Sequence, residues 1–373
     1  MTPLLKRLTS APTAAIAAAL LLAACASQPL TELSVDVPPG VRDARGRFAE
    51  IYCRVLEEHG TALPDYRPCT EALSPVVRPP AGTGRPVELG PSKLRLVVAA
   101  VPGIGYACVS KWLQDTGDEL AHIRRFGYDM SAIEVDALSG TAANAARIRD
   151  ALVALPEDAG PPRLVLLGYS KGTPDILEAI VRYPEIRRRI AAVISVAGAV
   201  RGSPVAEHAS ESEADLMRFF PGADCDAGDN EAVASLRPGV RNAWLAANPL
   251  PADLRYYSVV TLPGHARVSR ALVPTYKTLA KVDPRNDGQV IYSDQIVPGS
   301  VLLGFVNADH WAVALPIDRS HAVIGSLFVN HNDYPREALL EAVLRFVEED
   351  ITLSQTGGDA MSQGHEADAS KTH

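Results

Sequence analysis

The chain has 373 residues, of which 47% are hydrophobic and 21% are charged, and its formal net charge is −8. This composition excludes an intrinsically disordered chain, and the length allows one large α/β domain or two smaller ones. The excess of acidic residues argues against nucleic-acid binding, and against adhesion of the protein surface to anionic lipid.

The first 24 residues carry two basic residues before an apolar stretch at 14–24, and Cys25 follows. A basic start and an apolar region too short to span a membrane are typical of an export signal. Residues 22–25, LAAC, resemble the bacterial lipobox, whose cysteine is acylated. We therefore expect a lipoprotein signal peptide at 1–24 and a lipid anchor on Cys25, with an ordinary signal peptide as the alternative. Ala26 stands where an aspartate often signals inner-membrane retention, so the resemblance implies the outer membrane, with the protein facing the periplasm.

Four further cysteines follow, namely Cys53, Cys69, Cys108 and Cys225. In an oxidising envelope compartment they indicate two disulfides, for which three connectivities are possible. We favour Cys53 with Cys69 and Cys108 with Cys225, because the first two flank one helix-and-turn segment. The sequence contains no CxxC pattern and no close Cys/His pairing, so we expect no metal site.

Residues 25–92 are predicted to be a tether and an N-terminal covering segment. The tether at 26–40 is polar and rich in proline, 41–60 show helical spacing of apolar residues, and 61–92 are again rich in proline and irregular. A regular alternation then begins, with expected strands at 94–101 and 133–135 and helices after 106 and at 141–155.

The next element contains the most informative pattern in the chain. Residues 164–167 form the apolar run LVLL, and Gly168, Ser170 and Gly172 then complete G-x-S-x-G before a helical pattern begins. A strand, a sharp turn and a helix are the context in which this pattern exposes a nucleophilic serine. The two glycines leave room for a strained turn. An ordinary turn serine is the alternative reading.

The rhythm resumes with a buried strand at 190–196 and breaks at 203–251, where two helical patterns predict a cap or lid. A surface excursion with its own small core is the alternative for this insertion. Later elements are strands at 254–262 and 301–306, a closing helix at 338–347, and a polar tail at 353–373 that we expect to be disordered.

A serine hydroxyl needs a base, and the base needs an acid that orients it. His310 follows the strand at 301–306, where a loop from the carboxyl end of a sheet can reach the serine, and His321 and His331 are alternatives. Asp287 lies in an Asn-Asp-Gly turn before that strand. The alternatives for the acid are Asp283 and Asp294.

With these residues the chain resembles the α/β-hydrolase family of the esterase and lipase type over about 94–350. The resemblance implies an α/β fold with a mostly parallel central sheet, helices on both faces, a core at 93–202 and 252–352, and a helical cap at 203–251. It implies a Ser170, Asp287 and His310 catalytic triad in the order Ser, Asp, His that this family uses.

The resemblance also implies an oxyanion hole made by the main-chain N–H groups of Ile104 and Lys171, with Gly103 as an alternative to Ile104. The ammonium of Lys171 is expected to be solvated at the surface, although it could attract anionic substrates. Two family features differ, because Pro102 replaces the histidine of the common His-Gly pair and Val200 replaces a histidine before Arg-Gly-Ser.

The expected reaction is hydrolysis of a carboxylic ester, of small-molecule or lipid type, through an acyl-enzyme, with no cofactor and no metal. Thioesters, peptides and polyesters are alternative substrates for the same residues. A non-catalytic binding module of the cell envelope is the alternative from another class, and the sequence does not indicate an oligomeric state.

Overall fold

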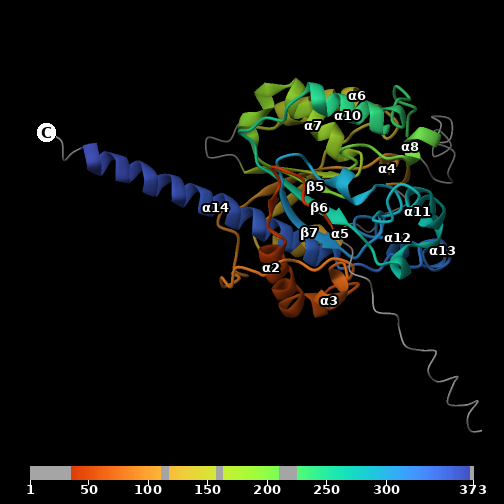
Figure 1. The fold of residues 1–373 in the computed structure, drawn as a ribbon, viewed down its shortest axis with the longest axis horizontal. Helices are drawn as coiled ribbons and strands as arrows, with labels where there is room; N and C mark the ends of the chain where they lie inside the picture. Colours follow the sequence, from red (N-terminus) through yellow and green to blue (C-terminus); the bar gives the residue numbers. More distant parts are fainter. Residues whose placement is uncertain (1–34, 111–116, 157–162, 210–224, 370–373) are drawn as a thin grey trace, which may run out of the picture.

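The computed structural model describes residues 35–110, 117–156, 163–209 and 225–369 (Figure 1). The expected signal peptide, the expected acylation site Cys25 and the first helical pattern of the expected cap lie outside the described residues. None of the helices within the described ranges combines the length and apolar character needed to span a bilayer.

The centre of the fold is one sheet of seven parallel strands, in the order β1-β7-β6-β5-β4-β2-β3. Its strands are β1 (Arg42–Asp43), β2 (Val97–Val101), β3 (Asp129–Ala132), β4 (Leu164–Tyr169), β5 (Ile190–Val196), β6 (Tyr256–Thr261) and β7 (Val301–Val306). Every residue of β5 is buried, as expected for an apolar strand in a parallel sheet that is covered on both faces.

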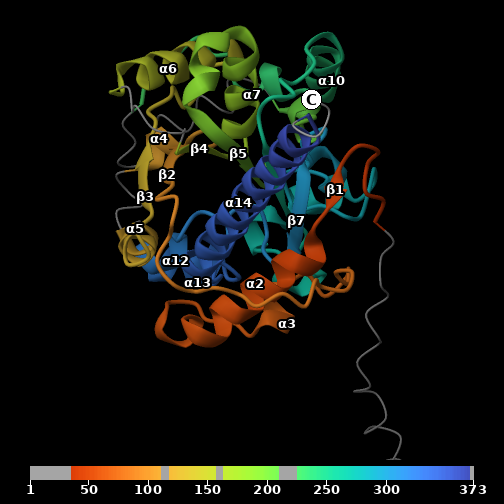
Figure 2. The same ribbon diagram turned by 90° about the vertical axis from the view of Figure 1, so that its left-hand side faces the viewer.

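Helices cover both faces of this sheet (Figures 1 and 2). One layer contains α6 (Thr141–Ala154), α7 (Gly172–Arg182) and α10 (Pro238–Ala247), and its core includes Ile148 and Leu177. The other layer contains α2 (Arg45–Glu58), α5 (Gly117–Arg124) and α14 (Arg336–Ala369), and its core includes Phe48, Ile123 and Leu344. This is the α/β-hydrolase architecture that the sequence predicts, with both apolar faces buried.

Short helices follow the carboxyl ends of the strands and shape one edge of the sheet. They are α4 (Tyr106–Val109) after β2, α8 (Val205–His208) after β5, α11 (Val273–Leu279) after β6, and α12 (Ile317–Ser320) and α13 (Ala322–Phe328) after β7. Strand order reverses between β2 and β4, since the chain runs outward to β3 and then returns. Such a reversal opens a crevice at the carboxyl ends of parallel strands.

The N-terminal segment differs from its expected role as a cover. Strand β1 pairs with β7 at the edge of the sheet, and Phe48, Ile51 and Tyr52 of α2 are fully buried. Residues 42–58 therefore belong to the main layers, because the apolar face of α2 is needed to close the core against α14. A short helix, α3 (Cys69–Ala72), lies beyond α2, and the disulfide between Cys53 and Cys69 joins the two helices.

Two further boundaries differ from the prediction. The strand expected at 133–135 lies at 129–132, because β3 is an edge strand whose polar residues pair with β2, while Ile133 is buried just beyond the pairing. The tail expected to be disordered from 353 is helical to Ala369. Adding turns to an existing helix costs far less than starting one, so a polar segment can continue a helix that is anchored in the core.

The predicted insertion at 203–251 is described at 203–209, which contains α8, and in its second half, from 225. There α10 packs beside α7, and its Trp244 and Leu245 contact the core of that helical layer. This half therefore extends the layer. Its apolar side chains find buried partners such as Leu254 in the layer itself.

Candidate active site

Ser170 lies at the turn between β4 and α7, where the backbone is strained. Its φ is 53°, in the left-handed region that residues with a side chain rarely adopt. A Cβ on Gly168 would lie 2.6 Å from the Thr173 backbone, and one on Gly172 would lie 2.0 Å from the carbonyl oxygen of Val101. The two glycines of the motif are therefore required by close backbone approach on both sides of the serine.

The structure brings together the three side chains that the sequence singled out. Ser170 Oγ lies 2.8 Å from Nε2 of His310, and Nδ1 of the same ring lies 2.7 Å from Oδ2 of Asp287. All three residues are buried, with 7%, 4% and 0% of their surface exposed for Ser170, His310 and Asp287. This linear arrangement lets the imidazole accept the serine proton while the carboxylate fixes the ring.

The carboxylate of Asp287 is held by donors that the sequence did not reveal. Oδ1 accepts hydrogen bonds from the N–H groups of Gln289 and Val290, and Oδ2 accepts them from the Thr261 hydroxyl and the Gln295 side-chain amide. Thr261 ends β6, and Gln295 lies in a short helical turn after the Asn-Asp-Gly segment. No local spacing links these residues, so the sequence carried no signal for them.

The loop after β7 is fixed on both sides of His310. The Asp309 carboxylate accepts hydrogen bonds from the N–H groups of Ser269 and Ala312, and the Tyr169 hydroxyl donates to the His310 carbonyl oxygen at 2.7 Å. The rings of Tyr169 and His310 lie 5.4 Å apart. Asp309 therefore fixes the conformation of the loop, and Tyr169, which precedes the serine, holds the base through its main chain and packs beside its ring.

The alternative acids have other partners. Asp283 forms an ion pair with Arg285 at 2.7 Å. Asp294 is largely buried, and this burial raises its pKa to about 6. Neither carboxylate bonds to His310 within the described part of the chain, and of the candidate acids it is Asp287 that reaches the ring.

The predicted oxyanion residues flank the serine. A Cβ on Gly103 would lie 3.0 Å from Ser170 Cβ, so the loop carrying Ile104 runs directly beside the serine. Lys171 is the N-cap of α7, where main-chain N–H groups have no partner within the helix. The expectation of a solvated Lys171 ammonium is wrong. The side chain is 2% exposed and pairs with Asp175 at 2.7 Å, in a part of α7 that contacts α6, where the Asn144 amide donates to the same carboxylate.

An apolar cavity of about 390 Å³ lies next to these loops. Pro102, Tyr106 and Tyr169 line it near the serine, and Leu339 and Val343 of α14 line it on the far side. Its volume falls in the range of small-molecule sites, which are mostly apolar with few polar groups. One such polar group is Glu119, whose pKa burial raises to about 7, with repulsion from Glu337 as a further cause.

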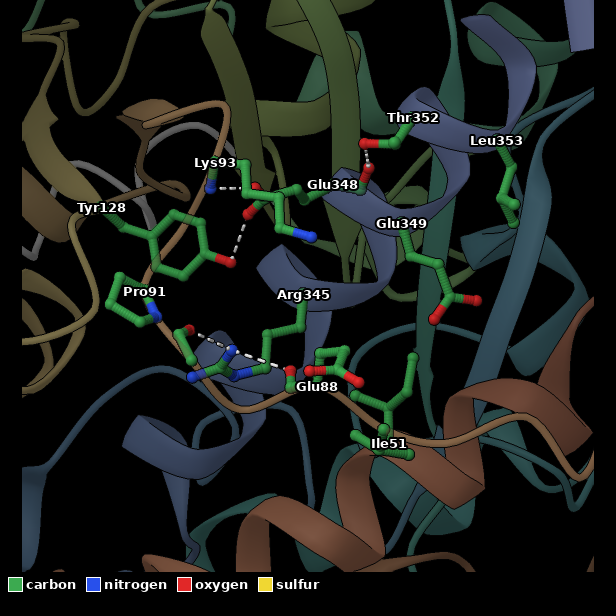
Figure 3. A pocket seen from close by; sticks show the side chains of 12 residues that line it. Ile51, Glu88, Pro91, Lys93, Tyr128, Arg345, Glu348, Glu349, Thr352 and Leu353 are labelled. Atoms are coloured by element: carbon green, nitrogen blue, oxygen red, sulfur yellow. Dashed lines mark hydrogen bonds between the residues drawn. The ribbon is translucent and has the colours of Figure 1, made fainter. Parts of the chain in front are cut away.

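A second cavity, of about 320 Å³, lies beside α14 and away from the serine (Figure 3). Two of the polar groups on its wall bond to neighbours. The Tyr128 hydroxyl donates to Glu348 at 2.7 Å, and Arg345 donates to the carbonyl oxygens of Glu88 and Gly90. Tyr128 and Arg345 are therefore engaged within the protein, and no residue of the serine site lines this cavity.

Within the described residues, His59, His122 and Glu341 lie close enough together to be considered as a metal-binding set. Both imidazoles contact Oε2 of Glu341, at 3.0 Å and 2.7 Å, and Arg345 donates to Oε1 at 2.6 Å. A cationic guanidinium on the same carboxylate disfavours a bound cation, so we read the group as a hydrogen-bonded junction between helices.

The second expected pair of cysteines also forms a disulfide, which links Cys108 of α4 to Cys225.

Comparison with known proteins places this geometry in a family. No model of a known family and no curated protein matches the sequence. Among solved structures, the chain is similar to the metagenomic carboxyl esterase MGS0156, with 39% identity over 91% of this chain and 100% of that chain and a TM-score of 0.77. It is less similar to the mature lipase BlEst2 of Bacillus licheniformis, with 21% identity over 65% of this chain and 96% of that chain and a TM-score of 0.49. With the first likeness extending over nearly the whole of both chains, the protein belongs to the α/β-hydrolase superfamily.

Proposed function

We propose that the protein is a serine hydrolase that cleaves carboxylic esters through Ser170, His310 and Asp287. The observation that carries this proposal is the unbroken hydrogen-bond chain from Ser170 Oγ through both ring nitrogens of His310 to Asp287. The 39% identity to a carboxyl esterase supports ester bonds as the target of that chain.

The reaction follows from the positions of these atoms. Ser170 Oγ forms a bond to the ester carbonyl carbon while its proton moves to Nε2 of His310. The Asp287 carboxylate stabilises the imidazolium through Nδ1. Nε2 then protonates the alkoxy oxygen, whose bond to carbon breaks, and an acyl group remains on Ser170. A water molecule repeats the two steps, so the acid is released and Ser170 Oγ regains its proton.

The negative charge that develops on the carbonyl oxygen needs donors beside the serine. We assign this role to the main-chain N–H groups of Ile104 and Lys171, one from the loop after β2 and one from the start of α7. The close approach of Gly103 to Ser170 supports this assignment. Such preorganised donors are commonly among the largest contributions to acyl-transfer catalysis.

Two further features of the proposal concern substrate and location. The apolar cavity beside Tyr169 favours an ester with an apolar acyl group, such as a small-molecule or lipid ester. The signal-like segment before Cys25 supports a lipid-anchored protein at the outer membrane, facing the periplasm. Globomycin treatment of producing cells, which blocks lipoprotein signal cleavage, should cause the uncleaved precursor to accumulate if Cys25 is acylated.

One labelling experiment tests the catalytic assignment. The full chain, purified in detergent, is treated with a fluorophosphonate probe, and the adduct is mapped by mass spectrometry. We expect a single adduct on Ser170 and none in a Ser170→Ala variant of equal thermal stability. A folded sample with ester hydrolysis but no adduct on Ser170 would refute the assignment.

A further inference from the structure

A buried ion pair lies directly behind the candidate nucleophile. Lys171 follows Ser170, and its ammonium lies 2.7 Å and 3.0 Å from the two carboxylate oxygens of Asp175, one turn further along α7. Both residues are 1% exposed. The ion pair thus links Lys171, through its side chain, to Asp175 in the first turn of α7.

The carboxylate of Asp175 continues this connection into the neighbouring helix. Oδ2 accepts a hydrogen bond from the Asn144 side-chain amide of α6 at 2.8 Å. Both the oxygen and the nitrogen of the Asn144 side-chain amide bond to the main chain of Asp136. It accepts from the Asp136 N–H at 3.0 Å and donates to the Asp136 carbonyl oxygen at 3.1 Å. The ion pair is therefore fastened to the loop that follows β3.

The loop after β3 also bonds to the segment that carries Ile104, the other predicted oxyanion residue. The Gly105 N–H, next to Ile104, donates to the carbonyl oxygen of Ala137 at 3.0 Å. Ala137 directly follows Asp136. The loop after β2, which carries one predicted oxyanion N–H group, is therefore bonded directly to Ala137. The start of α7, which carries the other, is linked to Asp136 through Asn144.

The energetics of this arrangement argue for a role beyond stability. Taking two charges out of water costs several kcal/mol per ion, and the attraction between them often does no more than offset that cost. Apolar residues of similar volume would serve stability as well. What apolar residues cannot supply is directional bonding, and in this network each partner has a fixed position.

We propose that Lys171, Asp175 and Asn144 are positioning residues that hold the two oxyanion N–H groups at a fixed separation through the loop at 136–137. The inference rests on the proposed ester hydrolysis. An oxyanion hole acts on charge that is present in the transition state and largely absent from the bound ester. Loosening it should therefore lower kcat and leave KM nearly unchanged.

The test uses the full chain in detergent, a short nitrophenyl ester and a trifluoromethyl ketone whose adduct with serine carries an oxyanion. Lys171→Met and Asn144→Ala should each lower kcat by about 10-fold to 100-fold, because removing one oxyanion donor outright costs about 10²-fold to 10³-fold. The inhibition constant of the ketone should rise by the same factor. KM and the pH dependence of kcat should stay as in the wild type.

Two further variants separate positioning from stability. Arg182→Met removes another ion pair of the same helix, in which Arg182 lies 2.9 Å from Glu178, and it should leave kcat and ketone affinity unchanged. The double variant Lys171→Met/Asp175→Leu replaces the buried charges with apolar groups. It should melt near the wild-type temperature and still show the loss of kcat, even if a single variant fails to fold.

The outcomes distinguish the two proposals. A wild-type chain that neither reacts with fluorophosphonate nor hydrolyses the ester refutes the proposed function. If the wild type is active, positioning is refuted by folded variants that keep the wild-type kcat and ketone affinity, whatever their melting temperature. It is also refuted if these variants raise KM and leave kcat unchanged.

Discussion

Two regions of the molecule place a histidine against a carboxylate at the same distance. At the carboxyl edge of the sheet, His310 Nδ1 lies 2.7 Å from Asp287, and between α5 and α14 His122 Nε2 lies 2.7 Å from Glu341. The pairs differ at the second ring nitrogen. In His310 that nitrogen meets Ser170 Oγ, whereas in His122 it is buried without a hydrogen-bond partner in the described structure.

The second carboxylate is also shared more widely. Glu341 bonds to His59 at the end of α2 and to Arg345 one turn along α14, in addition to His122 of α5. Its role is to join three helices in one layer. A histidine and a carboxylate at 2.7 Å therefore do not by themselves identify a catalytic base. The group on the other nitrogen decides between chemistry and structure.

The largest expected effect comes from breaking the catalytic pair. Ser170→Ala and His310→Ala should each lower ester hydrolysis by at least about 10⁴-fold and leave the melting temperature nearly unchanged. His122→Ala is the matched control, and it should lower the melting temperature while kcat is retained. Steady-state kinetics and thermal melting of the three variants check this. Wild-type turnover in His310→Ala would place the base elsewhere.

Replacing the orienting carboxylate should have the next largest effect. Asp287→Asn keeps the shape of the side chain but removes the charge that favours the productive tautomer of His310, so we expect kcat to fall by about 10³-fold to 10⁴-fold. Asp283→Asn, four residues earlier, is the control, because Asp283 pairs with Arg285. Equal losses of activity in the two variants would contradict the assignment of Asp287.

Much of the fold could be predicted because its signals are local. The strands at 190–196 and 301–306 have the predicted bounds, since a strand buried on both faces is a continuous apolar run that stands out in the sequence. The prediction for edge strand β3 was placed too late in the sequence. Its paired residues are mostly polar, whereas the apolar Ile133, which indicated a strand, lies just after the paired segment.

The serine, the acid and the base could be proposed from a motif and an order along the chain, and the structure brings Ser170, Asp287 and His310 into contact. The residues that hold these side chains in position could not be predicted from the sequence. Gln295 reaches Asp287 through a turn whose path depends on the whole loop. The burial of Lys171 beside Asp175 involves α6, whose Asn144 bonds to that carboxylate, and no pattern within residues 168–175 reports this contact.

The structural pair should respond in stability instead of turnover. Glu341→Gln leaves Arg345 buried without a carboxylate, which should lower the free energy of unfolding by about 3 to 5 kcal/mol in urea titrations at pH 7. Although burial opposes ionisation of Glu341, the hydrogen bond from His122 and the charge of Arg345 hold its pKa below the usual value.

The sign of the pH dependence follows from that lowered pKa. The stability that Glu341 contributes is present above the ordinary carboxyl pKa, and it is lost as the pH falls through the lowered pKa in the folded protein. The difference in free energy of unfolding between wild type and variant should therefore become smaller at acidic pH. Glu58→Gln, at an exposed pair with Arg54, is the control and should change stability by less than about 0.5 kcal/mol. A difference that stays constant down to pH 3 would contradict the role of Glu341.

The smallest effect concerns Glu119, a carboxylate without a histidine partner among the described residues. Oε2 of Glu119 is buried without a hydrogen-bond partner, and burial raises the pKa to about 7 from 4.5. The folded state therefore holds a proton that the unfolded chain releases near pH 4.5. The stability from this proton is complete below pH 4.5 and is lost as the pH rises through 7.

Glutamine imitates the protonated form, so Glu119→Gln should melt at the wild-type temperature near pH 4.5 and at a higher temperature at pH 8. Asp118→Asn, at the exposed neighbouring position, should show no such difference between the two pH values. Thermal melting at both pH values checks this. Equal shifts at pH 4.5 and pH 8 would mean that the variant changes packing in the apolar cavity, since a titrating carboxylate must act only where it is ionised.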